Sequence, residues 1–303
     1  MKSLLVGVVA FCSWTVVGAQ IAVPDGATAV ENTAARELAS ALGRVTGGTY
    51  EVVAESGAGE AVYYVGDTAL ARKLASANGW GSCAADEIRR GTVDGKTVLA
   101  GDATRGVLYS VDAFLEDVAG VRWWTTGESD YPSRPGWKPG EIAPYRYAPP
   151  FRFRETFYRA TLTDADFKVR AKVNTTSYTR YIIPPTKEQF IPAEKGGNHK
   201  LVFFKGRRSA YHSAFEVLPP AVYCKDHPDW YSGTNQWKGQ LCVTNPDMRR
   251  EYIRNTLALL RANPDCDSIQ VSQNDGRGMC ECPRCKAFYE REGGVRGARL
   301  VGS

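Results

Sequence analysis

The sequence predicts an α/β protein with an N-terminal α+β layer domain followed by the first half of a (β/α)8 TIM-type barrel. Three observations lead to this prediction. Strand-like and helix-like stretches alternate along the chain, a proline-rich segment (residues 131–150) divides it, and a late apolar stretch ends in polar residues. With 303 residues, 43% of them hydrophobic, the chain can bury two ordinary cores. We expect domains at residues 20–144 and 145–303, after a leader over residues 1–19.

The leader has the pattern of a secretory signal peptide. Lys2 precedes an apolar run from Leu4 to Val17, and small residues lead to Ala19. We therefore expect cleavage before Gln20 and a mature protein that is secreted or periplasmic. No later stretch approaches the roughly 18 apolar residues of a membrane span. The net charge of +5 comes without a basic block, which argues against nucleic acid as a partner.

The first domain begins with a short strand and a long helix. Ile21–Val23 is the strand, and Asn32 or Thr33 is the expected helix cap. The helix has apolar residues at helical spacing and stops at Gly47-Gly48. Ala61–Val65 is expected to be a second strand.

A hairpin and a second helix follow. Asp94-Gly95 lies between two β-rich runs and is a strong signal for a two-residue hairpin turn. The apolar stripe that begins at Val107 predicts a helix, which ends at Gly120.

The second domain shows strand, helix and strand in turn. Phe151–Glu155, Lys200–Phe204 and Ser268–Ser272 are expected strands, and Ala165–Val173 is an expected helix. Asn245-Pro246 begins a further helix, whose apolar face would consist of Ile253, Leu257 and Leu260. A complete barrel takes about 250 residues, so we expect the sequence to stop in mid-barrel.

The cysteines outside the leader are odd in number, so they cannot all pair within the chain. They are Cys83, Cys224, Cys242, Cys266, Cys280, Cys282 and Cys285. The last three span six residues and, with Cys242, would complete a tetrahedral structural Zn site. The alternative is one disulfide among these four, together with a pair such as Cys224 with Cys266, which an exported compartment allows. In both cases the role is structural, and catalysis would need no cofactor.

Several motifs resemble known families. Gly101–Tyr109 (GDATRGVLY) and Gly120–Trp124 (GVRWW) look like the non-catalytic α/β domain that precedes the barrel in family 20 hexosaminidases and family 67 α-glucuronidases. The second region is similar to the bacterial domain of unknown function 4838, grouped as glycoside hydrolase family 163. The motifs that carry this second resemblance are His212–Phe215, Leu218–Pro220, His227–Trp230, Gln240–Pro246, Val271–Gly276 and Cys280–Cys285.

The resemblance implies an exported endo-β-N-acetylglucosaminidase that acts on carbohydrate, namely N-glycan-like chains, by a retaining, substrate-assisted mechanism. In such enzymes the 2-acetamido oxygen of the sugar is the nucleophile. One alternative is a glycan-binding or inactive fragment that lacks half its barrel. Another is an exo-glycosidase such as an α-glucuronidase, which would share the N-terminal domain.

The resemblance makes Asn274 and Asp275 the expected catalytic residues, and they follow a predicted barrel strand, where the chemistry of a (β/α) barrel is carried. Asn274 would hydrogen-bond the acetamido group, and Asp275 would act as an acid or polarise that group. Read without the resemblance, Asn274-Asp275-Gly276 is simply a turn sequence.

Four further residues are candidates for substrate binding. Arg154 can donate two hydrogen bonds to sugar hydroxyls, next to Glu155, although a surface ion pair explains these two residues equally well. His212 lies in a polar loop. Trp230 would offer a stacking wall for a sugar ring, although aromatic residues more often fill a core.

Overall fold

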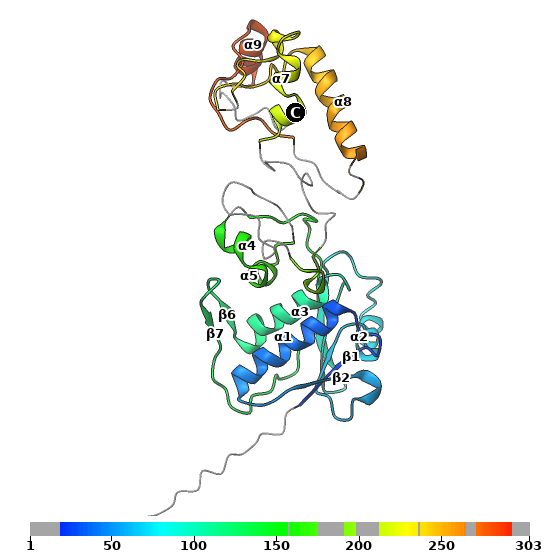
Figure 1. Cartoon of the computed structure of the whole chain (residues 1–303). Helices are drawn as coiled ribbons and strands as arrows, with labels where there is room; N and C mark the ends of the chain where they lie inside the picture. Colours follow the sequence, from blue (N-terminus) through cyan, green and yellow to red (C-terminus); the bar gives the residue numbers. More distant parts are fainter. Residues whose placement is uncertain are drawn as a thin grey trace, which may run out of the picture. The chain divides into compact units, whose positions relative to one another are not determined.

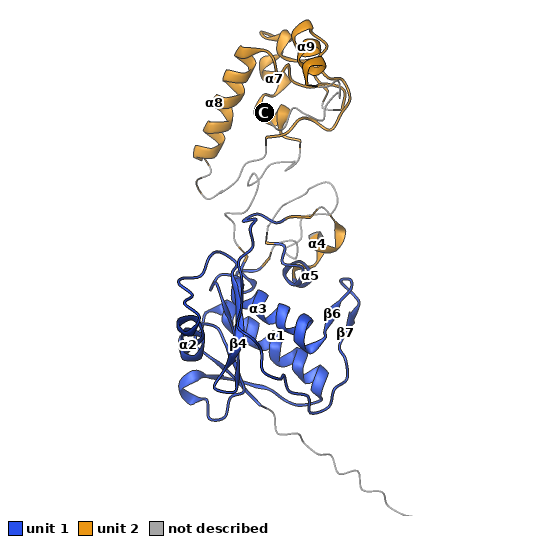
Figure 2. Cartoon of the chain, turned by 180° about the vertical axis from the view of Figure 1, so that it is seen from behind, with its two compact units in different colours: residues 1–154, 166–173, 192–196 blue, residues 155–165, 174–191, 197–303 orange. Residues whose placement is uncertain are grey.

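The computed structural model describes residues 19–156, 158–174, 191–197, 212–235, 237–262, 264 and 271–292. The chain forms two compact units, coloured separately in Figure 2. Unit 1 comprises Met1–Arg154, Asp166–Val173 and Pro192–Gly196. Unit 2 comprises Glu155–Ala165, Asn174–Ile191 and Gly197–Ser303. The leader expected over residues 1–19 lies outside the described residues, apart from Ala19.

Unit 1 is built on a mixed six-stranded sheet with the strand order β2-β1-β3-β5-β4-β8. The four strands from β2 to β5 run parallel, whereas β4 is antiparallel to both of its neighbours. The strands are β1 (Gln20–Val23), β2 (Glu51–Ala54), β3 (Tyr63–Val65), β4 (Ile88–Val93), β5 (Lys96–Gly101) and β8 (Tyr145–Tyr147). A separate ribbon pairs β6 (Arg122–Trp123) with β7 (Ser129–Asp130).

Helices cover both faces of this sheet. Helices α1 (Ala29–Thr46) and α3 (Gly106–Phe114) lie side by side on one face, and α2 (Ala69–Ala77) lies on the other (Figures 1 and 2). The layers bury an apolar core that includes Leu38 and Phe114, neither of which is exposed. The sequence therefore predicted an α/β fold correctly, and the parallel strands make this unit a mixed α/β layer.

Helix α1 starts earlier than the expected cap at Asn32 or Thr33. Its N-cap is Thr28, whose side chain accepts a hydrogen bond from the backbone of Glu31, while the Glu31 carboxylate accepts one from the backbone of Thr28. This reciprocal capping box satisfies two free N–H groups and so decides where the helix begins. The expected stop is confirmed, because Gly47 ends the helix at a φ of 71°.

The hairpin and the following helix also match the prediction. Asp94 and Gly95 have φ angles of 51° and 73° and join β4 to β5. Helix α3 continues into the π-helical turn η2 (Leu115–Ala119), and Gly120 ends it at a φ of 80°. Both positive-φ stops use a conformation that glycine adopts without steric cost.

Several other secondary-structure predictions were wrong. Tyr145–Tyr147 lies within the proline-rich segment yet forms β8, which pairs with β4 at the edge of the sheet. Phe151–Glu155 is not a strand, and the side chain of Arg154 instead donates hydrogen bonds to the backbone carbonyls of Phe151 and Lys172. The strands β2, β6 and β7 and helix α2 were not predicted at all.

Unit 2 consists, where described, of short helices joined by loops. Helix α8 confirms the expected start, because Asn245 caps it and Pro246 is its first residue. The expected apolar face is largely open, since Ile253 is 58% and Leu257 42% exposed. The helices are α4 (Arg159–Thr163), α5 (Ala165–Arg170, mostly in unit 1), α6 (Ala214–Val217), α7 (Pro220–Tyr223), α8 (Pro246–Ala262) and α9 (Pro283–Arg291).

A closed barrel is not seen in the described part of the chain. The strand expected at Lys200–Phe204 lies outside the described residues, as does most of Ser268–Ser272. The only β pairing described in unit 2 is a single bridge between Tyr231 and Leu241. Among the described residues, no helix has both the length and the apolar character needed to cross a membrane.

Candidate active site and metal centre

Unit 2 contains a hollow of about 650 Å³ that gathers charged, amide and aromatic side chains. Three segments form it: the residue His212 ahead of α6, the loop around Trp237 and the loop that follows Ser272. Its lining residues are His212, Trp237, Lys238, Gln273, Asn274, Asp275, Gly276 and Arg277. The structure thus brings together three of the predicted site residues, namely His212, Asn274 and Asp275.

Asp275 and His212 face one another at this hollow. The distance from His212 Nε2 to Asp275 Oδ2 is 3.8 Å, and the two side chains are 42% and 65% exposed. His212 Nδ1 lies 3.3 Å from the carbonyl oxygen of Gln273. Because a carbonyl can only accept, Nδ1 is the donor in that contact, and Nε2 is the ring nitrogen that lies nearest the carboxylate. The pair therefore places an imidazole beside a carboxylate at the surface of the hollow.

Asn274 is buried, with only 1% of its surface exposed. Its amide Nδ2 donates to the carbonyl oxygen of Gly239 over 3.0 Å. Among the described residues, its Oδ1 has no hydrogen-bond partner. The structure therefore places the Asn274 amide inside the loop packing, beneath the surface that Asp275 presents.

Arg154 and Glu155 are not among the residues that line the hollow. Arg154 belongs to unit 1, where its guanidinium lies 2.7 Å from the carboxylate of Asp86. This is the ion-pair alternative considered above, although Arg154 is largely buried. Glu155 accepts a hydrogen bond from the backbone N–H of Thr156.

Trp230 takes the core position that the sequence left open. It is 5% exposed and stacks on the His227 ring with a centroid distance of 4.0 Å. The aromatic residue at the hollow is instead Trp237, which is 55% exposed. The sequence offered a signal for it, because Trp237 stands alone among turn-forming and polar residues (TNQWKGQ), where no core is expected.

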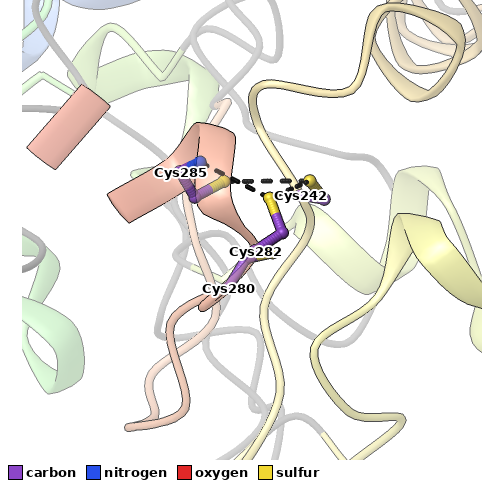
Figure 3. Close-up of side chains that lie close together, drawn as sticks. All are labelled: Cys242, Cys280, Cys282 and Cys285. Carbon is purple, nitrogen blue, oxygen red and sulfur yellow. Dashed lines mark hydrogen bonds between the residues drawn. The ribbon is translucent and has the colours of Figure 1, made fainter. Parts of the chain in front are cut away.

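The four predicted metal ligands form one cluster. Figure 3 shows Cys242, Cys280, Cys282 and Cys285 where the loop that carries Cys242 meets the start of α9. The four sulfur atoms lie within 4.8 Å of one another. Cys242 Sγ is 3.7 Å from the sulfurs of both Cys282 and Cys285.

These distances fit a metal ion better than a disulfide. A disulfide needs sulfurs about 2.05 Å apart, and all the described cysteines are free. A tetrahedron with Zn–S bonds of about 2.3 Å has sulfur–sulfur edges of about 3.8 Å, close to the 3.7 Å contacts of Cys242. The cluster can therefore hold a structural metal such as Zn. The alternative pair of Cys224 with Cys266 cannot be judged, because Cys266 lies outside the described residues.

The thiols differ in their readiness to ionise. Burial raises the pKa of Cys242 and of Cys280. Cys282 is the N-cap of α9, and the backbone N–H of Cys285 donates to its sulfur over 3.4 Å. That hydrogen bond is the main reason why the pKa of Cys282 is lowered to about 6. One ligand is thus prepared as a thiolate by the helix start itself.

Comparison with known proteins identifies the second region. The family described as "Domain of unknown function (DUF4838)" matches residues 123–301, which confirms the resemblance noted in the sequence. No curated protein matches the chain.

Among solved structures, the chain is similar to one titled "A novel family GH115 4-O-Methyl-alpha-glucuronidase, BtGH115A, with specificity for decorated arabinogalactans". The TM-score is 0.46 and the sequence identity 13%, over 91% of this chain and 39% of that chain. The chain thus spans about two fifths of the length of that distant glycoside hydrolase.

Proposed function

We propose that this chain, which belongs to the family of the domain of unknown function DUF4838, is an exported glycoside hydrolase. Its activity would be that of an endo-β-N-acetylglucosaminidase on N-glycan-like chains, within a partial (β/α) barrel domain. The observation that carries the proposal is the pairing of Asp275 with His212 in a hollow that also exposes Trp237. The resemblance to family 163 hydrolases, stated above, supplies the substrate class.

The residues of the hollow suit a substrate-assisted reaction. Glycosidases ordinarily use two carboxylates, but Asp275 is the only carboxylate in the described lining of the hollow. When the acetamido oxygen of the sugar attacks the anomeric carbon, the substrate replaces the second carboxylate. The bond to the leaving oxygen then breaks, and water later opens the cyclic intermediate with overall retention.

Each side chain has a role in this proposal. Asp275 polarises the acetamido group or delivers the proton to the leaving oxygen, and Nε2 of His212 exchanges that proton with the carboxyl group. The exposed ring of Trp237 gives a sugar ring an apolar surface to stack on. The burial of Asn274 favours a role in supporting the loop over direct contact with the acetamido group.

We also propose that the ion held by Cys242, Cys280, Cys282 and Cys285 is Zn²⁺, in a structural role. Four thiolates close the coordination sphere, which leaves no open position for a substrate. Catalysis in this proposal therefore uses no metal or other cofactor.

The experiment is an assay of the purified chain on glycans that contain N-acetylglucosamine. We expect glycan release, with inhibition by a cyclised thiazoline that mimics the intermediate. Asp275→Asn should lower turnover at least about 10²-fold, the usual effect of losing a positioned acid or base. Asp226→Asn is the matched control, because Asp226 is exposed in the same unit and does not line the hollow. Near-normal turnover in Asp275→Asn would remove this residue from the mechanism.

A glycan-binding module is the second candidate, and the single carboxylate of the described lining favours it. In that case the chain would bind the same glycans in a calorimetric titration and release nothing, while Trp237→Ala would abolish the binding. Cleavage of a glucuronide substrate instead would indicate the exo-acting α-glucuronidase alternative.

Export has its own test. Protein recovered from the periplasm or the medium should have an N-terminus at or near Gln20. Recovery from the cytoplasm with Met1 intact would contradict this part of the proposal.

A further inference from the structure

Gln240 opens the Gln240–Pro246 motif and has no role in the function proposed above. It is 3% exposed. Its backbone is fixed from both sides by Ser232, whose N–H donates to the Gln240 carbonyl over 2.9 Å and whose Oγ accepts from the Gln240 N–H over 2.8 Å. The side chain of Gln240 therefore starts from a well-defined position.

The amide of Gln240 holds the backbone on both sides of Asp275. Its Oε1 accepts from the N–H of Asn274 over 3.0 Å. Its Nε2 donates to the carbonyl of Asn274 over 2.8 Å and to the carbonyl of Gly276 over 3.1 Å. One side chain thus makes three hydrogen bonds to the residues before and after Asp275.

The surrounding backbone is packed closely, with glycines where the segments meet. A Cβ atom on Gly239 would clash with the carbonyl oxygen of Gly233, and one on Gly278 would clash with that of Lys238. Gly278 also has a φ of 102°, a conformation that other residues rarely adopt. The Gln240 segment and the Asp275 loop therefore meet backbone to backbone, with the amide of Gln240 as their polar link.

Asp275 itself is held only lightly at its carboxyl end, which is 65% exposed and 3.8 Å from His212. Its direction is therefore set by its backbone. We propose that Gln240 is a positioning residue, which aims the Asp275 carboxyl into the hollow by fixing the peptide groups on both sides of it. This inference rests on the function proposed above.

The test is the isosteric variant Gln240→Glu. A carboxylate can accept from the Asn274 N–H but cannot donate to the two carbonyls, so it repels them. When protonated, the introduced carboxyl can donate to one of them again. Turnover should therefore fall about 10²-fold, as for a misplacement of about 1 Å, with little change in KM. The loss should deepen as pH rises through the pKa of the introduced carboxyl, adding a limb to the pH profile that the unmodified protein lacks.

A second measurement does not depend on activity. Hydrogen exchange at the Asn274 amide should quicken at least 10-fold in Gln240→Met, which removes the oxygen that accepts from the Asn274 N–H as well as the donor to the two carbonyls, while the metal content stays the same. Asn255→Asp is the matched control. It removes an amide that donates to Val217 O and Tyr223 Oη in the same unit, away from the hollow.

The outcomes separate the two proposals. Unchanged exchange at Asn274 in Gln240→Met together with an unchanged pH profile in Gln240→Glu would overturn the positioning role. If the unmodified chain turns over no glycan, the proposed function fails, and the exchange data still show whether Gln240 holds the loop. An equal loss of turnover in Asn255→Asp would show that general destabilisation explains the effect, and would also overturn the positioning role.

Discussion

Different interactions stabilise the interior of each unit. Unit 1 packs an apolar core between sheet and helices, and buries the carboxylate of Glu87 between the guanidinium groups of Arg89 and Arg146. The described part of unit 2 has a smaller apolar cluster, around Leu218 and Trp230, and joins its loops through thiols and the amide of Gln240. We therefore expect the stability of unit 1 to depend on core packing and on pH, and the stability of unit 2 to depend on the bound metal.

Metal removal is expected to have the largest effect, and only on unit 2. Elemental analysis should give about one Zn per chain, and Cys285→Ser or a strong chelator should remove it. Structural Zn sites contribute on the order of 10 kcal/mol to small domains. Backbone amides of residues 237–245 and 271–292 should therefore lose protection from hydrogen exchange, while those of unit 1 keep theirs.

Cys83→Ser is the control for metal removal, because Cys83 is a free, exposed thiol of unit 1. It should change neither the metal content nor the exchange. If mass spectrometry found the four clustered thiols in disulfides, the predicted metal site would be refuted. The stability of unit 2 would then not depend on a metal.

Glu87→Gln should be the most damaging of the charge substitutions in unit 1. It leaves the buried guanidinium of Arg89 without its partner at 2.6 Å, a loss that typically costs about 3–5 kcal/mol. Asp94→Asn breaks the exposed pair with Lys73 and keeps a residue suited to the turn, so it should cost no more than about 1 kcal/mol. Chemical denaturation followed by hydrogen exchange in unit 1 would measure both variants.

Because of Glu87, we expect unit 1 to lose stability at low pH, which gives an acid limb in its stability profile. Burial by itself would raise its pKa, but hydrogen bonds from Arg146, from the Ala84 N–H and from Arg89 lower the pKa of Glu87 to about 2. The unfolded chain therefore binds the proton first, and stability is lost as pH falls from about 4.5 toward 2. A Glu87→Gln variant with the same acid limb would contradict this assignment.

The pH dependence that Asp112 contributes should have the opposite sign. It is 1% exposed, and neither carboxyl oxygen has a hydrogen-bond partner among the described residues. Burial, together with the charge of Glu37, raises the pKa of Asp112 to about 8. Between about pH 4 and pH 8 the folded state keeps a proton that the unfolded chain releases, so stability falls as pH rises.

Asp112→Asn should therefore stabilise unit 1 at pH 8 by more than about 1 kcal/mol and leave it unchanged near pH 4. Asp67→Asn, at an exposed pair with Arg72, should show no such pH dependence. Equal effects of Asp112→Asn at both pH values would refute the raised pKa.

The sequence predicted features that depend on neighbouring residues and missed those that depend on distant ones. The Asp94-Gly95 turn and the helix stop at Gly47 follow from local conformational preference. Strand β8 does not, because it pairs with β4 more than fifty residues earlier and lies among prolines that indicate a linker. Propensity alone does not reveal which distant strand completes a sheet edge.

The candidate site divides in the same way. The spacing of Cys280, Cys282 and Cys285 limits their geometry, and the cluster with Cys242 was predicted. Trp230 and Trp237 have the same chemistry, and only the packing decides that one is buried and the other exposed. The support that Gln240 gives to the Asp275 loop joins residues 34 to 36 positions apart, so no local pattern indicates it.

The start of α1 tests this distinction with the smallest expected effect. The sequence pattern favoured Asn32 or Thr33 as the cap, whereas the structure has Thr28 in a reciprocal capping box with Glu31. Thr28→Ala removes an N-cap oxygen and should lower the free energy of unfolding of unit 1 by about 1 kcal/mol. Thr33→Ala loses two exposed hydrogen bonds within the helix, one from its hydroxyl to the Ala29 carbonyl and one that the hydroxyl accepts from Arg36. Alanine is the better helix former there, so the change should be neutral or slightly stabilising. Denaturant titrations of the two variants measure this difference. If Thr33→Ala lowered the free energy of unfolding more than Thr28→Ala does, Thr33 would be the helix cap.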